Sequence, residues 1–212
     1  MAKITSSQFR ILKRKSIFKG RIFSLDSIRM RGPHKKVFEH QVVQHPGAAV
    51  IIPVLDENHL ICIRQFRSSI RRVLWEFPAG TLEKGESPLA CARRELAEEV
   101  HCQARYFKKI GTIYPAPGIS TELMHLYVAW SLTPALKDRD HDEFLEPKVL
   151  SLSDFDRMIA RGVIQDAKTV VGYFYGKKFL SSFFRKRLSK QTRNRSSNAE
   201  VKKRLRKGRC HG

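Results

Sequence analysis

The chain has 212 residues with an ordinary apolar fraction of 42%, which is enough for one sizeable hydrophobic core and favours a single main domain. No apolar run approaches the roughly 18 residues of a membrane span, and the N-terminus lacks the apolar segment of a secretory signal, so neither class of protein is expected. The net charge is +21, which favours phosphate-rich partners such as nucleotides, RNA, DNA or anionic lipid.

The first part of the chain is predicted to be β-structure. Alternating apolar and polar residues predict a β-hairpin or bent strand pair over Phe18–Met30, and a further strand over Val37–Gln44. The near-continuous apolar run Gly47–Leu55 predicts a buried central strand. A turn at Asp56-Glu57-Asn58 then leads to a paired strand over His59–Phe66.

The middle of the chain predicts a strand, a tight turn and a helix. Trp75–Gly80 has the composition of a strand that ends in a turn. A helix is predicted over Pro88–Val100, because Ser87 can cap its first turn and Pro88 suits its first position. The remaining predicted elements are strands at Tyr106–Thr112, Met124–Trp130 and Val149–Ser151, a rigid loop at Pro115–Ser120, and helices at Asp154–Arg161 and Asp166–Leu180.

Three glutamates of the predicted helix share one face. Glu98 and Glu99 follow Glu95 by three and four residues, and this spacing places Glu95 and Glu99 on one face with Glu98 beside them. Like charges so placed repel by roughly a few tenths of a kcal/mol per pair, a cost that a divalent cation would remove. Hard oxygen ligands suit Mg²⁺ or Mn²⁺. Glu86 lies close enough to join this cluster, and Arg94 would hold the carboxylates by bidentate pairing. The alternative is a solvated helix with an acidic stripe.

A longer pattern surrounds these glutamates. Gly80 is followed after five residues by Glu86, and after seven more by Arg94-Glu95-Leu96-x-Glu98-Glu99-x-His101-Cys102. This pattern resembles the Nudix box at nearly every defining position, with Gly80, Glu86 and Arg94 as structural support of the site. One departure is His101, where the family has a Gly that ends the helix with positive φ. A His there is expected to cost on the order of 1 kcal/mol, and it removes no metal ligand.

The resemblance covers roughly Phe18 to Leu180. The runs VVQHPGAAVIIPV, IRQFR and WEFPAG, with Pro117-Gly118 and Ser120-Thr121-Glu122 further on, are similar to the ADP-ribose pyrophosphatase branch of the family. It implies an α/β class fold, an α/β/α sandwich around a mixed β-sheet. The division it implies is an N-terminal β region at 1–45, a Nudix hydrolase domain at 46–180 and a basic tail at 181–212. Members of this branch are often homodimers that exchange N-terminal strands, so the resemblance also implies a homodimer.

The same resemblance assigns roles to individual residues. The carbonyl of Ala79, with Glu95 and Glu99, would ligate Mg²⁺ or Mn²⁺, while Glu98 would ligate or bridge a second ion; Glu98 and Glu99 would serve catalysis. Arg67 would contact the diphosphate, with a plain edge-strand charge as an equally weighted alternative. The residues that would shape the pocket are Pro117 and Gly118, and those that would stack on the base are Phe23 and Phe38, for both of which core packing is the favoured alternative.

The family also has an acidic residue on a loop late in the fold. The acidic segment from Asp140 to Glu146 fits that place, and Glu143 is the first candidate for a metal-bound or water-activating carboxylate. Glu146 is the second candidate, and His141 stands where some relatives have their catalytic glutamate. A mobile loop carrying the base would let the site close over bound substrate. The alternative is a solvated acidic loop.

The reaction that the resemblance implies is Mg²⁺-dependent hydrolysis of a nucleoside diphosphate sugar. ADP-ribose would give AMP and ribose 5-phosphate; GDP-mannose or another nucleotide sugar is the alternative substrate. A different class is an RNA-directed Nudix enzyme that acts on capped 5′ ends. A non-catalytic binding module is also possible in this fold, but the intact set of glutamates argues against it.

The C-terminal tail and the cysteines bear on partners and compartment. Residues 185–209 hold twelve Lys and Arg against one acidic residue, so the segment beyond Ser181 is expected to be mostly disordered and to contact polyanions such as RNA. A solvated appendage without a partner is the alternative. The four cysteines form no CxxC pair, which favours a reduced, cytoplasmic protein. Cys62, Cys91 and Cys102 are expected to act as small buried hydrophobes.

Overall fold

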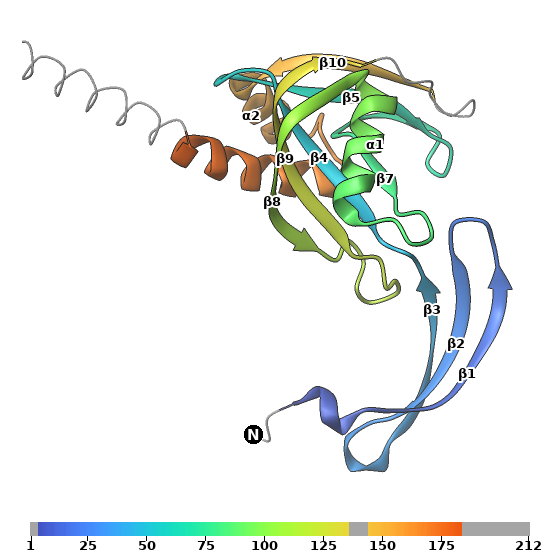
Figure 1. Ribbon diagram of the computed structural model, residues 1–212. Coiled ribbons are helices and arrows are strands. Elements are labelled where there is room, and N and C mark those ends of the chain that lie inside the picture. Colours follow the sequence, from blue (N-terminus) through green and yellow to red (C-terminus); the bar gives the residue numbers. More distant parts are fainter. Residues whose placement is uncertain (1–3, 136–143, 184–212) are drawn as a thin grey trace, which may run out of the picture.

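The computed structural model describes residues 4–135 and 144–183, which form two β-sheets and three α-helices (Figure 1). The strands are β1 (Arg10–Lys19), β2 (Ser24–Arg31), β3 (Val37–Gln44), β4 (Ala48–Val54), β5 (His59–Arg67), β6 (Arg72–Glu76), β7 (Ala79–Thr81), β8 (Cys102–Ile113), β9 (Met124–Pro134) and β10 (Leu145–Ser151). The helices are α1 (Pro88–Val100), α2 (Leu152–Ala160) and a C-terminal helix over residues 167–183. Single-turn 3₁₀ helices lie at Ser6–Gln8 and Pro33–Lys35.

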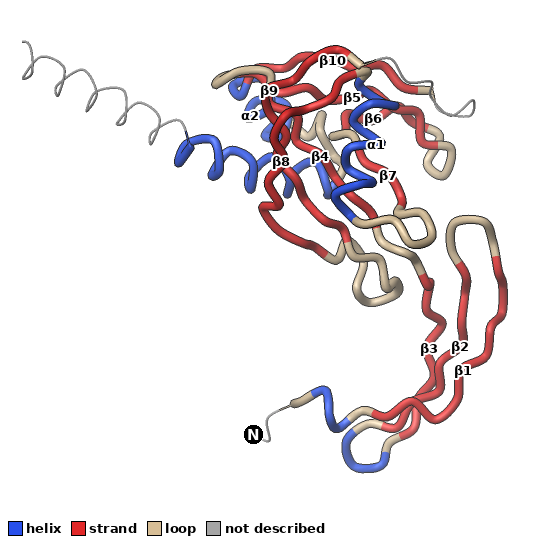
Figure 2. Tube along the Cα trace, in the orientation of Figure 1, coloured by secondary structure: helices blue, strands red, loops and turns tan. Residues whose placement is uncertain are grey.

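Seven strands form the main sheet. Its order is β10-β5-β4-β9-β8, with β6 added beside β5 and β7 beside β4. Strands β4 and β9 run parallel, and the other pairs are antiparallel. This mixed sheet, with helices on its faces (Figure 2), confirms the predicted fold class.

Helices cover both faces of the main sheet because β4 is buried on both sides. Every residue of β4 is buried, as the continuous apolar run predicted. Val50 and Ile52 pack on one face with Phe155 of α2 and Tyr173 of the C-terminal helix. Ala49 and Ile51 point to the opposite face, where they pack with the buried apolar residues of α1, Cys91, Ala92, Leu96 and Val100. The alternation of side chains along one strand therefore supplies two cores, as a sandwich requires.

The predicted strand Trp75–Gly80 is wrong as a single element. The chain forms β6 up to Glu76 and β7 from Ala79, separated by Phe77 and Pro78. Proline has no N–H for a ladder and breaks the strand at this point. As a result β6 pairs with β5, whereas β7 pairs with β4. The break turns the chain inward beneath α1.

Strands β1, β2 and β3 form a second sheet that extends away from the main sheet (Figure 1). The predicted hairpin is confirmed, but its first strand begins at Arg10 rather than Phe18. All ten residues of β1 are exposed, so no buried face imposes the alternating pattern from which a strand is predicted. Near its end, β3 is tied to the main domain at Val43, whose N–H donates to Ile119 O at 2.8 Å.

The C-terminal helix continues beyond its predicted end at Leu180. It reaches residue 183, and the Phe183 ring lies 5.4 Å from that of Trp130. Residues 184–212 of the predicted basic tail lie outside the described part of the chain, so the tail stays a prediction. Among the described residues, no helix is long and apolar enough to cross a membrane. Cys62 and Cys91 are buried as predicted, whereas Cys102 is half-buried.

Candidate functional site

Local signals define both ends of the acidic helix α1. The Ser87 side chain accepts a hydrogen bond from Ala90 N at 3.2 Å and Pro88 takes the first position, as predicted. At the other end His101 adopts the left-handed conformation, with φ 54° and ψ 38°. The glycine-like geometry expected at this position is thus adopted by a histidine, and the helix still ends where the box requires.

Strand β7 lies directly under the acidic face of α1. Its Ala79 N–H donates to Glu99 Oε2 at 2.9 Å, and the Glu99 side chain is completely buried. A β-carbon on Gly80 would lie only 1.6 Å from Glu95 Oε1. Gly80 is therefore required by the space that the Glu95 carboxylate occupies, so the spacing from Gly80 to Glu95 in the box has a steric cause.

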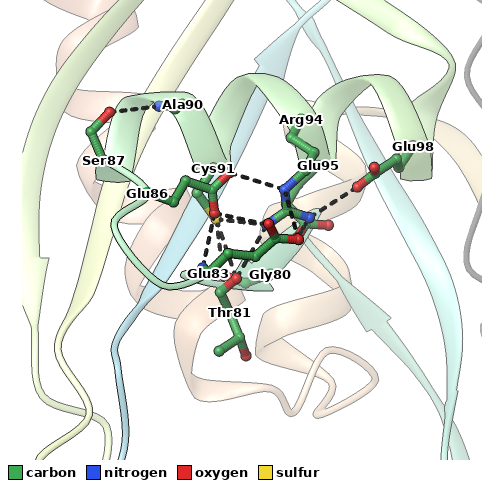
Figure 3. A network of polar contacts seen from close by, with 10 residues as sticks. All are labelled: Gly80, Thr81, Glu83, Glu86, Ser87, Ala90, Cys91, Arg94, Glu95 and Glu98. Atoms are coloured by element: carbon green, nitrogen blue, oxygen red, sulfur yellow. Dashed lines mark hydrogen bonds and ion pairs between the residues drawn. The ribbon is translucent and has the colours of Figure 1, made fainter. Parts of the chain in front are cut away.

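Arg94 lies where the carboxylates meet (Figure 3). Its guanidinium donates from Nε to Glu86 Oε1 at 3.0 Å, and from Nη1 to Glu95 Oε1 at 2.6 Å and Glu98 Oε2 at 3.0 Å. Nη2 also donates to the carbonyl of Thr81 at 3.2 Å. The predicted bidentate pairing is confirmed for Glu86, which receives both Nε and Nη2. One guanidinium thus links the loop, β7 and two turns of α1.

The electrostatics of this network follow from those bonds. Hydrogen bonding from Arg94 lowers the pKa of the Glu86 carboxyl. The same bond, together with the charge of Glu95, raises the pKa of Arg94, against the opposing effect of burial. The carboxyl of Glu86 and the guanidinium of Arg94 are therefore both ionised near neutral pH, which keeps the ion pair between them intact.

The donor chemistry of the face fits a divalent cation. Glu95, Glu98 and Glu99 offer hard carboxylate oxygens at helical spacing, and Gly80 leaves room for the Glu95 carboxylate. Among the described residues, no three acidic, imidazole or thiol groups converge as a finished metal site. Figure 3 shows that Arg94 is instead the counter-ion of Glu86, Glu95 and Glu98. A cation would share these carboxylates with Arg94 or displace it from them.

A cavity of about 210 Å³ opens beside this network. Its lining residues are Ala48, Arg67, Ala79, Gly80, Thr81, Pro115, Glu122, Met124, Asp166, Ala167 and Lys168. It thus joins β7, whose Ala79 and Gly80 contact the glutamates of α1, to the start of the C-terminal helix. The volume suits part of a nucleotide substrate rather than the whole of it.

The structure brings some predicted substrate contacts to this cavity and not others. Arg67 lines it, as a diphosphate contact should. Pro117 and Gly118 lie on the neighbouring loop but are not among the lining residues. Phe23 lies at the β1–β2 turn, where its ring contacts Phe18 at 6.0 Å, and Phe38 packs against Phe9 and His40 on the N-terminal sheet. Within one chain, neither ring lines the cavity.

The late acidic segment is only partly described. Glu143 and His141 lie outside the described residues, so their roles stay predictions. Glu146 lies on β10, where its side chain is half exposed and paired with Lys148 and, at 4.0 Å, with Arg64. Hydrogen bonding from Lys148 lowers the pKa of the Glu146 carboxyl.

Sequence analysis missed two charged residues beside the cavity, Glu76 and Lys168. Both are buried, and they contact each other although 92 positions separate them in sequence. One signal was present for Glu76: a charge inside the apolar run WEFPA, next to Phe77, is rare unless it is paired.

The chain is similar to a known protein family and to individual proteins of known name. A family model described as "NUDIX domain" matches residues 44–173. The chain is 34% identical over 172 residues to an ADP-ribose pyrophosphatase of Bacillus subtilis (strain 168), covering 80% of this chain and 93% of that protein. It is 33% identical to a methanol dehydrogenase activator of Bacillus methanolicus, over 78% of this chain and 91% of that protein.

Two further similarities concern substrate and fold. A GDP-mannose pyrophosphatase of Cronobacter sakazakii (strain ATCC BAA-894) is 33% identical over 135 residues, covering 59% of this chain and 70% of that protein. Among solved structures, a crystal structure of an ADP compounds hydrolase superposes with a TM-score of 0.75 at 23% identity. The superposition covers 85% of this chain and 98% of that chain, which supports the same fold.

Proposed function

The chain belongs to the NUDIX family, and on that basis we propose that it is a Mg²⁺-dependent hydrolase of a nucleoside diphosphate sugar, with ADP-ribose as the first substrate. The observation that carries the proposal is that Arg67 lines the same cavity as Ala79 and Gly80, the two β7 residues that contact the Glu99 and Glu95 carboxylates of α1. A diphosphate bound there would meet a cation-binding face and a guanidinium at once. GDP-mannose is the alternative substrate, because one relative carries that name.

Different residues of the proposed site bind the substrate, bind the metal and accept the proton. Arg67 pairs with the anionic diphosphate and orients it, while Glu95, Glu98, Glu99 and the Ala79 carbonyl would hold Mg²⁺. When bound, the ion neutralises the diphosphate and polarises it toward attack. Water attacks one phosphorus, the P–O bond of the anhydride breaks, and AMP and ribose 5-phosphate leave. We assign the proton of that water to a carboxylate, with Glu143 as the first candidate and Glu98 and Glu99 as the other catalytic carboxylates.

A substrate panel tests the proposed function. Purified full-length protein with Mg²⁺ is expected to hydrolyse ADP-ribose at a higher kcat/KM than GDP-mannose, other nucleotide sugars, dinucleotides or capped RNA. The measurement is phosphate release in a coupled phosphatase assay, with and without a chelator. Preferred hydrolysis of GDP-mannose would move the assignment to the alternative substrate. Preferred decapping would replace it with the RNA-directed class, and no hydrolysis of any member would refute it.

We also propose that the protein is a homodimer joined through the N-terminal sheet. Large apolar side chains are exposed across that sheet: Ile11, Leu12, Ile17, Phe18, Phe23 and Val37 are each between 39% and 52% exposed. An apolar surface of this kind marks an interface.

Light scattering tests this dimer. The wild-type chain is expected to elute with the mass of two chains, and Ile17→Asp is expected to shift it toward one, because a charge is costly in an apolar interface. Val149→Asp is the matched control, since Val149 is 53% exposed on β10 and Ile17 is 52% exposed on β1. A monomeric wild type, or an equal shift in the control, would contradict the proposal.

A further inference from the structure

A buried ion cluster stands behind the substrate-binding face of Arg67. The Glu76 side chain is 1% exposed and accepts two hydrogen bonds from Arg67, from Nε at 2.8 Å and from Nη2 at 2.6 Å. Burial would raise the pKa of Glu76, but the Arg67 hydrogen bond and the charge of Lys168 hold it below its usual value. Glu76 is therefore a carboxylate at neutral pH, and its fork fixes the plane of the guanidinium.

Lys168 completes the cluster from the opposite end of the chain. Its ammonium contacts Glu76 Oε2 and lies 3.0 Å from Asp166 Oδ1, with 9% of its side chain exposed. Asp166 in turn accepts hydrogen bonds from the N–H and hydroxyl of Thr169 at 2.9 and 2.6 Å. The first turn of the C-terminal helix is thus pinned, and Lys168 with it.

The charges of this cluster balance. Arg67 and Lys168 contribute two positive charges, and Glu76 and Asp166 contribute two negative charges, all within the contacts given above. Without Lys168 the sum becomes −1 beside the cavity, where an anionic diphosphate would bind. The carboxylate of Glu76 would also lose a partner in a buried position, which is costly.

The geometry points to a role for Lys168 in substrate binding. The fork to Glu76 uses one edge of the Arg67 guanidinium, and a guanidinium has five N–H donors, so Nη1 keeps its donors for a second partner. We propose that Lys168 is a positioning residue for the diphosphate: through Glu76 it keeps Arg67 oriented toward the cavity and keeps the cluster electrically neutral. This inference rests on the proposed function, since it takes the diphosphate of the substrate as the group that Arg67 binds.

Steady-state kinetics of the full-length protein with ADP-ribose and Mg²⁺ test the role. Lys168→Met is expected to raise KM by about tenfold or more and to change kcat much less, because the variant weakens binding of the anion rather than the chemical step. Lys168→Arg restores the charge and is expected to bring KM back to within about threefold of the wild type. Lys168→Gln keeps a donor toward Glu76 and serves where the methionine variant does not fold.

Two controls separate positioning from general stabilisation. Lys177 lies on the same helix and pairs with Asp156 at 2.7 Å, away from the cavity; Lys177→Met removes a charge and an ion pair of this helix and is expected to leave KM unchanged. The second control is epistasis. In an Arg67→Met background, Lys168→Met is expected to add little to KM, because Lys168 acts through Arg67.

Three results would overturn the positioning role of Lys168, and a fourth would overturn the proposed function. An unchanged KM in Lys168→Met, an equal rise in Lys177→Met, or fully additive effects of Lys168→Met and Arg67→Met would overturn the positioning role while the proposed function stands. If the wild-type chain hydrolyses no nucleotide sugar, the proposed function fails first and the inference falls with it. A KM effect confined to Lys168 and dependent on Arg67 supports both.

Discussion

Replacing Glu99 with Gln is expected to lower kcat for ADP-ribose by about two to four orders of magnitude while the protein stays folded. Glu99 is fully buried, and one of its oxygens accepts the Ala79 N–H at 2.9 Å. Glutamine has the same shape, and its carbonyl oxygen can keep that bond, so the packing of α1 on β7 is preserved. The substitution removes only the negative charge that a bound Mg²⁺ would need.

This result is measured as turnover alongside thermal unfolding and Mn²⁺ titration. Glu57→Gln provides the control, because Glu57 is an exposed glutamate in the turn between β4 and β5 and has no place at the site. The control should behave as the wild type in all three measurements. Wild-type turnover in the Glu99 variant would remove Glu99 from the site.

The second large effect is expected for Gly80→Ala. The new methyl group would overlap the Glu95 carboxylate, which lies 1.6 Å from its position. The carboxylate has to move, because β7 is fixed by its pairing with β4 at Ala49. We expect kcat/KM to fall by about a hundredfold, since a small misplacement of a reacting group is costly, and the free energy of unfolding to fall by about 1–3 kcal/mol.

Gly176→Ala is the matched control for this prediction. A β-carbon there would meet Ile52 Cγ2 at 3.1 Å, a tight contact in the core that is remote from the carboxylates. It is expected to alter stability without lowering kcat/KM. Comparison of the two variants by kinetics and calorimetry separates loss of packing from displacement of Glu95. Equal kinetic effects would show that the Gly80 requirement is one of stability alone.

The sequence predicted best those elements whose determinants lie close together. The bounds of α1 were correct because Ser87 and Pro88 fix its start. The array of Glu95, Glu98 and Glu99 was accessible for the same reason, since three- and four-residue spacing dictates a shared face. Strand β1 was missed over most of its length because a strand without a buried face has no periodic pattern.

The remaining half of the site depends on contacts between distant segments. Lys168 reaches Glu76 only because the C-terminal helix packs on the main sheet, and no local pattern encodes that approach. The break at Pro78 was visible as a proline, but the change of pairing partner from β5 to β4 that follows it is a property of the whole sheet. The sequence pattern therefore identified the acidic face of α1 and pointed to Arg67, but it gave no sign of the ion pairs behind Arg67.

The interruption between β6 and β7 limits the distance between two charged parts of the proposed site. Glu76 fixes the guanidinium that would read an anion, and Ala79, three residues later, fixes the carboxylate that would hold a cation. Three residues span at most about 10 Å. The segment between them is rigid, because Pro78 has a restricted φ and the Phe77 N–H donates to Thr169 Oγ1 at 2.8 Å. The two charged groups therefore keep a fixed separation, and under the proposed function the diphosphate of the substrate would have to span it.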